Sequence, residues 1–352
     1  MPDTIESLNG QRVRFGAGLR HEIGVEMARA GLRAALVLST PEQGELARSV
    51  AASLGPRAAG VLAEAAMHTP TEVTARALAV AARRGADCVV SVGGGSTIGL
   101  GKAIALHTDL VQIVVPTTYA GSEATPILGQ TEAGVKTTQS SPKVLPEVIL
   151  YDPELVTSLP GRMTVTSALN AIAHAAEALY ARDRSAATGD LALDGIRSMA
   201  EGLPLVVAAP GDVAARETTL RGAWACGTVL GEVGMALHHK LCHTLGGTLG
   251  LPHAETHAIV LPHALAYNEA AVPELLAPMA ALLGGPTASR AVWQFARATG
   301  APVALSELGV GPEDVDRVVE LALRNPYWNP REVTEAGLRG LLLNAIRGLE
   351  PQ

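Results

Sequence analysis

Short runs rich in β-branched residues alternate with helical segments through the first 150 residues, and this alternation constrains the fold more than any other feature. The runs are Ala34–Ser39, Asp87–Val92, Val111–Val115 and Val148–Tyr151. Two of the helical segments open with Thr-Pro, at Thr40 and Thr69, and proline is favoured at the first position of a helix. Strands that alternate with helices are typical of a parallel sheet with crossover helices. The pattern therefore predicts an α/β domain built on a parallel sheet.

The strand pattern stops after Asp152, and the rest of the chain is rich in alanine and leucine at helical periodicity. The 352 residues exceed the ~250–300 residues at which a single core usually stops growing. Only ten residues are aromatic (Trp 3, Tyr 5, Phe 2), so the interior must be filled by small and aliphatic side chains. We therefore predict two domains, an α/β domain over residues 1–155 and an all-helical domain over residues 156–352.

Charge and hydropathy exclude several classes of partner. The net charge is −7, from 27 basic and 34 acidic residues, and no basic run is present, so nucleic acid is not an expected partner. No apolar stretch reaches the ~18 residues of a membrane span, and the N-terminus lacks the segments of an export signal. Three cysteines in apolar contexts suit reduced thiols. We expect a cytoplasmic protein that binds no membrane.

Two loops that follow predicted strands suggest a nucleotide site. The first is glycine-rich and opens a helix, whose N-terminal N–H groups and dipole favour a phosphate. Its spacing is neither that of a P-loop nor the usual dinucleotide fingerprint, and a tight turn without ligand is the alternative for this loop alone. The second loop is rich in hydroxyl groups, and two such loops on adjacent strands favour a dinucleotide-binding domain. The residues concerned are Gly93, Gly94, Gly95 and Ser96, followed by Thr117, Thr118, Tyr119 and Ser122.

Six of the ten histidines fall between His238 and His263. His239 and His243 are four residues apart, so they share a helix face, and the same spacing joins Asn170 to His174 on an apolar segment. With His253, these pairs can converge on a metal, or on a substrate that needs neutral donors and a proton source. For His257 and His263 we favour packing or supporting roles.

These motifs resemble the iron-containing alcohol dehydrogenase family over nearly the whole chain. The resemblance rests on Gly-Gly-Gly-Ser with Lys102 six residues beyond, on Pro-Thr-Thr with the following Gly-Ser-Glu, and on the paired histidines. It implies a nucleotide-binding α/β domain, a helical domain and an active site in the cleft between them. The positions that bind a divalent metal in that family are Asn170, His174, His239 and His253 here, and His243 also matches.

Several departures are similar to the maleylacetate reductase subgroup of the family. Asn170 replaces the family's metal-binding aspartate, Gly99 replaces an aspartate after the glycine loop, and the Pro-Thr-Thr loop is one residue shorter. The same resemblance is carried by His68–Pro70, Gly134–Thr138 and Leu251–His257. It implies reduction of maleylacetate, a small dicarboxylate, to 3-oxoadipate with NADH or NADPH in the degradation of aromatic and chloroaromatic compounds. It also implies a homodimer.

An amide oxygen gives a divalent ion no charge, so the change at Asn170 predicts a site without tightly bound metal, although three imidazoles can still hold zinc weakly. Hydride addition to an alkene conjugated to a ketone leaves an enolate, which imidazole donors stabilise before a protonated histidine completes the reaction. His243 and His253 are our candidates for those two roles, without an assignment of the acid. His239, His174 and Asn170 are expected to orient the substrate.

The remaining predictions concern the cofactor and the substrate carboxylates. Ser39-Thr40 stands where NAD-selective relatives place a carboxylate, so both NADH and NADPH are expected to bind; Thr40 can also simply cap its helix. Lys102 and Lys136 are candidate anchors for the cofactor. Tyr119, Ser122, His239 and His253 are candidates for binding the substrate. Two alternatives stay open, a metal-dependent alcohol or polyol dehydrogenase and a lyase like dehydroquinate synthase.

Overall fold

The computed structural model describes residues 3–7 and 9–351, apart from the side chains of Asp3, Glu6 and Lys136. The described chain divides into two compact units. The first comprises residues 1–159 and 211–220, and the second comprises residues 160–210 and 221–352. The domain ranges predicted from sequence did not include the return of residues 211–220 to the first unit.

The first unit is built on a seven-stranded sheet with the order β1-β2-β9-β6-β5-β3-β4. Every neighbouring pair is parallel except β1 and β2, which are antiparallel. The strands are β1 (Asp3–Glu6), β2 (Arg12–Phe15), β3 (Ala35–Leu38), β4 (Ala58–Leu62), β5 (Cys88–Gly93), β6 (Val111–Pro116) and β9 (Val148–Tyr151). A separate hairpin is formed by β7 (Ile127–Glu132) and β8 (Val135–Ser140). The predicted parallel sheet is confirmed.

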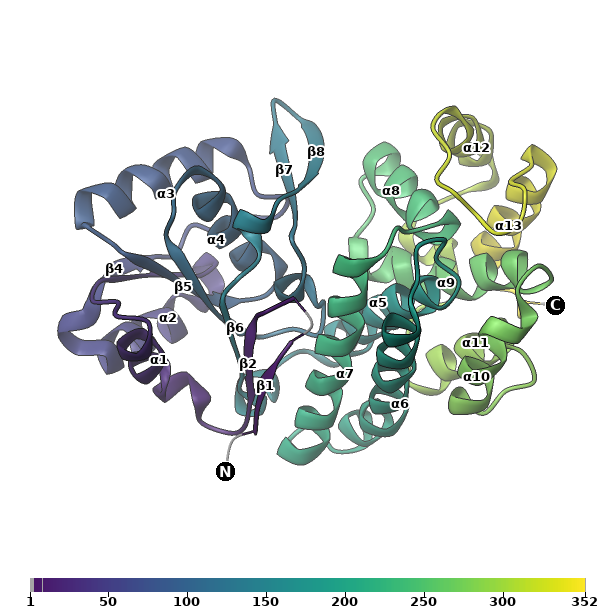
Figure 1. Cartoon of the computed structure of the whole chain (residues 1–352). Coiled ribbons are helices and arrows are strands. Elements are labelled where there is room, and N and C mark those ends of the chain that lie inside the picture. The colour runs from purple at the N-terminus through teal and green to yellow at the C-terminus, as the bar shows by residue number, and fades with distance from the viewer. Residues whose placement is uncertain (1–2, 8, 352) are drawn as a thin grey trace. The chain divides into compact units, whose positions relative to one another are not determined.

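Helices cover both faces of this sheet (Figure 1). Alternate residues of β3 and β5 enter two separate apolar clusters, because successive side chains of a strand point to opposite faces. One cluster contains α1 (Ile23–Arg29) and α2 (Gly44–Leu54). The other contains α3 (Thr71–Arg84) and α4 (Gly95–His107). Burial on both faces explains why the strands read as continuous aliphatic runs.

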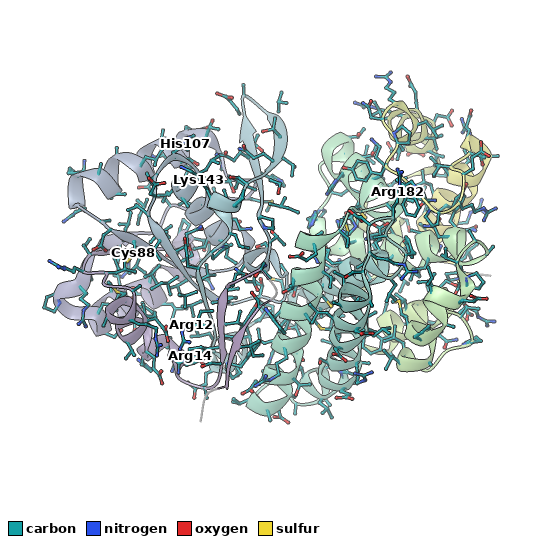
Figure 2. All side chains as sticks on the ribbon, in the orientation of Figure 1. Arg12, Arg14, Cys88, His107, Lys143 and Arg182 are labelled. Carbon is teal, nitrogen blue, oxygen red and sulfur yellow. The ribbon has the colours of Figure 1, made fainter. Side chains whose placement is uncertain are left out.

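A buried ion-pair cluster fastens α1 to the sheet. Arg12 and Arg14 extend from β2 (Figure 2), and they lie 2.8 and 2.9 Å from the carboxylate of Glu26. Burial alone would raise the pKa of Glu26, but the two guanidinium groups hold it below its ordinary value. Both arginines are therefore structural.

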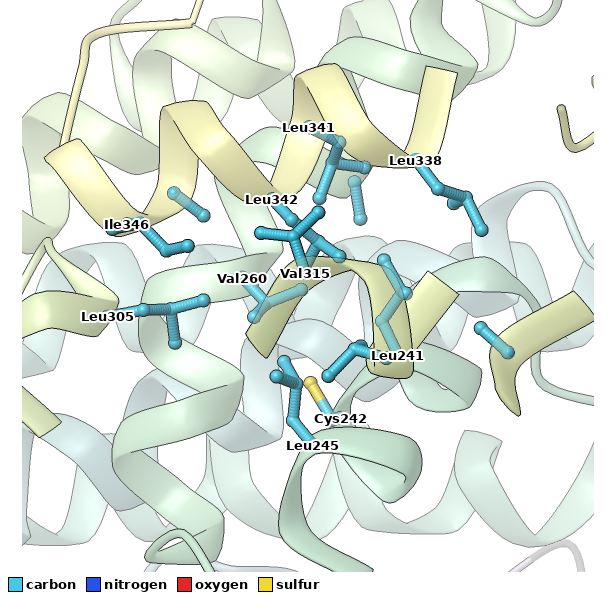
Figure 3. Packing of buried hydrophobic residues seen from close by; sticks show 14 of the residues in the cluster. Leu241, Cys242, Leu245, Val260, Leu305, Val315, Leu338, Leu341, Leu342 and Ile346 are labelled. Atoms are coloured by element: carbon cyan, nitrogen blue, oxygen red, sulfur yellow. The ribbon is translucent and has the colours of Figure 1, made fainter. Parts of the chain in front are cut away.

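The described part of the second unit is helical. Its helices are α5 (Gly161–Leu179), α6 (Ala186–Ala208), α7 (Val213–Glu232, whose first residues belong to the first unit), α8 (Leu237–Leu249), α9 (His253–Glu269), α10 (Pro273–Leu283), α11 (Ala288–Ala298), α12 (Val315–Arg324) and α13 (Glu335–Arg347). Leu241, Cys242 and Leu245 of α8 pack with residues of α12 and α13 in one apolar cluster (Figure 3). The predicted all-helical second domain is confirmed. Within the described residues, no helix has both the length and the apolar character needed to cross a membrane.

Candidate active site

The two loops predicted to bind a nucleotide lie at one edge of the sheet. Strand β5 pairs in parallel with β6, and Gly93 is opposite Pro116 at the carboxyl ends of the two strands. The N–H group of Thr117 donates to the carbonyl oxygen of Gly93 at 3.1 Å. Ligands of open α/β sheets bind at this end of the strands, so the fold places both loops where a nucleotide site is expected.

Glycine is required in the first loop because the second loop packs against it. A Cβ atom on Gly94 would lie 2.7 Å from Cγ2 of Thr118, and one on Gly93 would collide with Thr97. The side chain of Gln43, which follows β3, donates to Oγ1 of Thr117 at 2.9 Å and so links a third loop to the same edge. Gln43 was not predicted from the sequence as a site residue.

The start of α4 has the features of a phosphate site. Gly94 caps the helix and Gly95 and Ser96 form its first turn, where N–H groups lack helical partners. The buried hydroxyl of Ser122 has no hydrogen-bond partner among the described residues, and it lies 4.0 Å from a Cβ atom built on Gly95. Free donors and an unpartnered hydroxyl beside a side-chain-free backbone fit the pyrophosphate of a dinucleotide.

Lys102 lies beneath this loop and is buried. Its ammonium group donates to the carbonyl oxygens of Ser122, Thr125 and Ile127 at 2.5 to 2.9 Å, and to Oγ1 of Thr125 at 3.0 Å. Burial lowers the pKa of Lys102 to about 7, and the buried carboxylate of Glu123 opposes that shift. The predicted contact with a cofactor phosphate is untested, but these acceptors occupy the ammonium group. We therefore assign Lys102 to holding the loop in place.

Replacing Lys102 with methionine tests that assignment. The three carbonyl groups would lose their buried donor, so we expect the free energy of unfolding to fall by about 2–4 kcal/mol and the Kd for NADH to rise. Thermal unfolding and NADH fluorescence titration measure the two effects. Lys143→Met is the matched control, because Lys143 is exposed and its ammonium group pairs with exposed Asp109. Unchanged stability in Lys102→Met would contradict the assignment.

The other predicted positions of the first unit are Ser39, Thr40, Tyr119 and Lys136. Ser39 is buried, and its hydroxyl donates to the carbonyl oxygen of Thr40. Thr40 is partly exposed. Tyr119 is also buried, and its hydroxyl accepts a hydrogen bond from Arg216 at 3.0 Å. Burial raises the pKa of Tyr119 to about 12, although Arg216 opposes the shift. Lys136 lies on β8, but its side chain is outside the described part of the structure.

In the second unit, one face of α5 carries Asn170, His174 and Glu177. They are separated by four and three residues, which places them on neighbouring turns of one helix face. All three side chains are buried. Oδ1 of Asn170 and Nδ1 of His174 have no hydrogen-bond partner among the described residues. An unpaired buried polar atom is costly, so this face is suited to a ligand that supplies the missing partners.

Glu177 connects α5 to the histidines of α8. Its carboxylate accepts hydrogen bonds from the backbone N–H groups of Ala236 and His238 at 2.8 and 2.7 Å. One of its oxygens is 2.7 Å from Nδ1 of His239. The carboxylate therefore caps the N-terminus of α8, where the helix dipole favours a negative charge, and fixes the ring of His239. The other ring nitrogen of His239, Nε2, is buried without a partner among the described residues.

The histidine rings form a buried floor and an exposed rim. The floor includes His174, His239 and His257, with ring centroids 5.3 Å apart for His174 and His239 and 5.0 Å apart for His239 and His257. The rim consists of His243 and His253, whose rings are exposed and stacked with centroids 6.5 Å apart. The structure therefore brings the predicted histidines together, and it separates them by access to solvent.

Burial sets the charge of the floor. Desolvation, followed by the proximity of other histidines, lowers the pKa of His174 and of His257 well below its ordinary value. Both rings are therefore neutral at physiological pH. A neutral imidazole can donate or accept a hydrogen bond, but it lacks the extra proton with which an imidazolium acts as a general acid.

Tyr327, which was not predicted from the sequence as a site residue, also reaches the rim. The hydroxyl of Tyr327 is 3.2 Å from Nδ1 of His243, and the ammonium group of Lys240 lies 5.6 Å from the centre of the Tyr327 ring. Burial raises the pKa of Tyr327, so its phenol is neutral. Tyr327 therefore holds the ring of His243, and its own ring lies beside the cation of Lys240.

In this chain the family's metal positions lack their carboxylate ligand. Asn170 supplies an uncharged oxygen in place of a carboxylate. Among the described residues, one group of possible metal ligands has its ligand atoms within 4.8 Å of one another: His238, Cys242 and His257. None of these three residues is a metal position of the family. In that group two ring nitrogens already share a hydrogen bond of 3.1 Å, and burial raises the pKa of the Cys242 thiol well above its ordinary value.

Comparison with known proteins decides the family. Residues 10–153 match the family model described as iron-containing alcohol dehydrogenase. Residues 164–346 match the model of the C-terminal part of the Fe-containing alcohol dehydrogenase family. The chain belongs to the iron-containing alcohol dehydrogenase family. The resemblance read from the glycine loop and the paired histidines is therefore confirmed.

Within this family, several similar proteins share one name. The maleylacetate reductase of a Rhizobium species is 60% identical over 341 residues, which are 97% of each chain. That of Sphingobium indicum is 50% identical over 340 residues, 97% of this chain and 96% of its own. The crystal structure of maleylacetate reductase from Agrobacterium tumefaciens matches with a TM-score of 0.96 and 58% identity, covering 100% of both chains. The predicted subgroup and fold class are both confirmed.

Proposed function

We propose that this chain is a maleylacetate reductase that uses NADH or NADPH. The similarity to such reductases over 97% of the chain supports this function, and so does a histidine site in which an amide replaces the family's carboxylate. The reaction consumes maleylacetate, the reduced nicotinamide and one proton, and yields 3-oxoadipate and the oxidised cofactor.

The observation that carries the proposal is the arrangement of unpartnered polar atoms on a buried floor beneath an exposed rim. When bound, the reduced nicotinamide supplies a hydride to the alkene carbon β to the ketone. The alkene electron pair then moves towards the carbonyl group and gives an enolate. Preorganised donors stabilise such an oxyanion more effectively than water does, and the neutral imidazoles of His174 and His257 can supply such donors.

The rim suits the proton transfer. The carbon α to the carbonyl group must receive a proton, and the proton donor must then recover one from solvent. His243 and His253 are exposed, so either can be reprotonated between turnovers, whereas His174 is buried and neutral. We assign the proton transfer to the rim pair, and substrate orientation to Asn170, His174 and His239.

The substrate carries two carboxylates, and Lys240 is the cation that we assign to one of them. It lies beside Tyr327 at the rim, and burial lowers its pKa only from a value far above neutrality. Ser122, by contrast, lies next to Gly95, which favours a role near the cofactor phosphates. Buried Tyr119 pairs with Arg216, so we propose a loop-supporting role for it in place of direct substrate contact.

We further propose that the resting enzyme holds no tightly bound metal. The missing carboxylate at Asn170 supports this proposal. The alternative, a metal-dependent alcohol or polyol dehydrogenase of the same family, requires an ion for activity. A homodimer and a cytoplasmic location stay predictions.

One assay tests the function and the metal requirement separately. Oxidation of NADH and of NADPH is followed with maleylacetate, before and after dialysis against a chelator, with the metal content measured in both samples. We expect turnover with both cofactors and no loss after dialysis. Failure to oxidise either cofactor would refute the proposed function, and chelator-sensitive turnover would refute only its metal-free part. Steady turnover also distinguishes the reductase from a lyase that regenerates its NAD within each cycle.

A further inference from the structure

We propose that His257 is a substrate-facing hydrogen-bond donor whose tautomer is set by His238. The inference rests on the proposed function and extends it to two residues outside the family's metal positions. Both side chains are fully buried. From the sequence we expected a packing or supporting role for His257, and the position of its ring favours a direct role instead.

The ring of His257 lies in the middle of the histidine floor. Its centroid is 4.1 Å from that of His253 and 5.0 Å from that of His239. Nδ1 of His257 is 3.1 Å from Nε2 of His238. Nε2 of His257 is buried and has no hydrogen-bond partner among the described residues. One nitrogen of the ring is therefore committed to His238, and the other is available to a ligand.

A hydrogen bond between two imidazole nitrogens holds one proton, and its position fixes both tautomers. Sγ of Cys242 lies 3.7 Å from Nε2 and 3.9 Å from Nδ1 of His238, and a thiol can donate or accept, so this contact is compatible with either tautomer. We place the proton of His238 on Nε2, from which it is donated to Nδ1 of His257. The remaining proton of His257 then lies on Nε2.

The substrate chemistry requires the same orientation. A ketone oxygen, an enolate and two carboxylates all accept hydrogen bonds, and none of them donates one. A lone pair on Nε2 of His257 would therefore repel the substrate, whereas an N–H group stabilises it. Because charge grows on the oxygen during hydride addition, such a donor acts mainly on kcat, and loss of one oxyanion donor costs about 10²–10³-fold.

Two sets of variants separate this role from packing. His257→Phe keeps an aromatic ring but removes both nitrogens, and we expect kcat to fall about 10²-fold with a smaller change in KM. His238→Phe removes the donor to His257, and we expect a loss of about tenfold in kcat. His238→Gln restores an N–H donor and should recover most of that loss. His263→Gln, on the same helix and also buried, is the matched control and should retain wild-type kcat.

Long-range ¹H–¹⁵N spectra of histidine-labelled wild-type enzyme report the tautomers without any assay. We expect the Nε2–H form for His257. The signal of His257 is assigned as the one that disappears in the spectrum of His257→Gln. An Nδ1–H form of His257, or an unchanged kcat in a folded His257→Phe variant, would overturn the inference. Neither result would contradict the proposed function, which is tested separately by the wild-type assay with maleylacetate. One equivalent of zinc in the wild type, lost in His238→Gln, would show that His238, Cys242 and His257 bind a metal and would also overturn the inference.

Discussion

Replacing Glu177 with alanine is expected to lower kcat about 10²-fold and the free energy of unfolding by about 3–5 kcal/mol, the cost of breaking a buried pair. The carboxylate is fully buried and accepts hydrogen bonds from Ala236, His238 and His239. Its removal leaves two backbone donors at the start of α8 unsatisfied. It also releases the ring of His239 to adopt either tautomer.

Glu177→Gln separates the two effects. An amide of the same size still accepts from the helix N-terminus, so stability should recover by more than half. It carries no charge and can present an N–H group to His239, so kcat should stay well below that of the wild type. Glu201→Ala on α6 removes an exposed carboxylate of the same unit and serves as the control. Urea unfolding and steady-state kinetics measure both quantities, and wild-type kcat in Glu177→Ala would rule out the positioning role.

The fold could be predicted where local sequence and tertiary environment agree. Strands β5 and β6 are buried on both faces, so they read as mainly aliphatic runs, interrupted only by Ser91 and Gln112 before the terminal Gly93 and Pro116. Strand β4 was not predicted, because Ala58-Ala-Gly-Val-Leu62 contains one β-branched residue and depends on pairing with β3. The β7–β8 hairpin was also missed: its residues are mostly polar, and several are exposed. Such strands are determined by their partners more than by their own propensity.

The candidate site shows the same division. Helical spacing was sufficient to pair Asn170 with His174 and His239 with His243. The same spacing could have added Glu177, three residues beyond His174, but a glutamate in a helix is ordinarily read as a surface residue. The roles of Tyr119 and Lys102 could not be predicted, because they depend on tertiary contacts. Tyr119 pairs with Arg216, 97 residues away, and the acceptors of Lys102 are carbonyl groups that a loop turns inward.

Asn170→Asp is expected to convert the site towards metal binding. Oδ1 of Asn170 is buried and without a partner in the described structure, so a carboxylate there would be a buried charge next to His174. An unpaired buried charge is destabilising, and a divalent ion bound by this carboxylate and nearby imidazoles would relieve the penalty. We therefore expect the metal-free variant to unfold at a lower temperature than the wild type. We expect added zinc to stabilise it by about 2.7 kcal/mol at a free concentration one hundred times its Kd.

The same variant should lose activity with maleylacetate, by at least about tenfold, because a new negative charge faces a dianionic substrate. Calorimetric titration with zinc, thermal unfolding with zinc or chelator, and NADH oxidation measure the three effects. Asn344→Asp introduces the same charge on the exposed surface of α13 and should show none of them. A folded Asn170→Asp variant that bound zinc no better than the wild type would contradict this prediction. The amide at position 170 would then not be the reason that the resting enzyme lacks a metal.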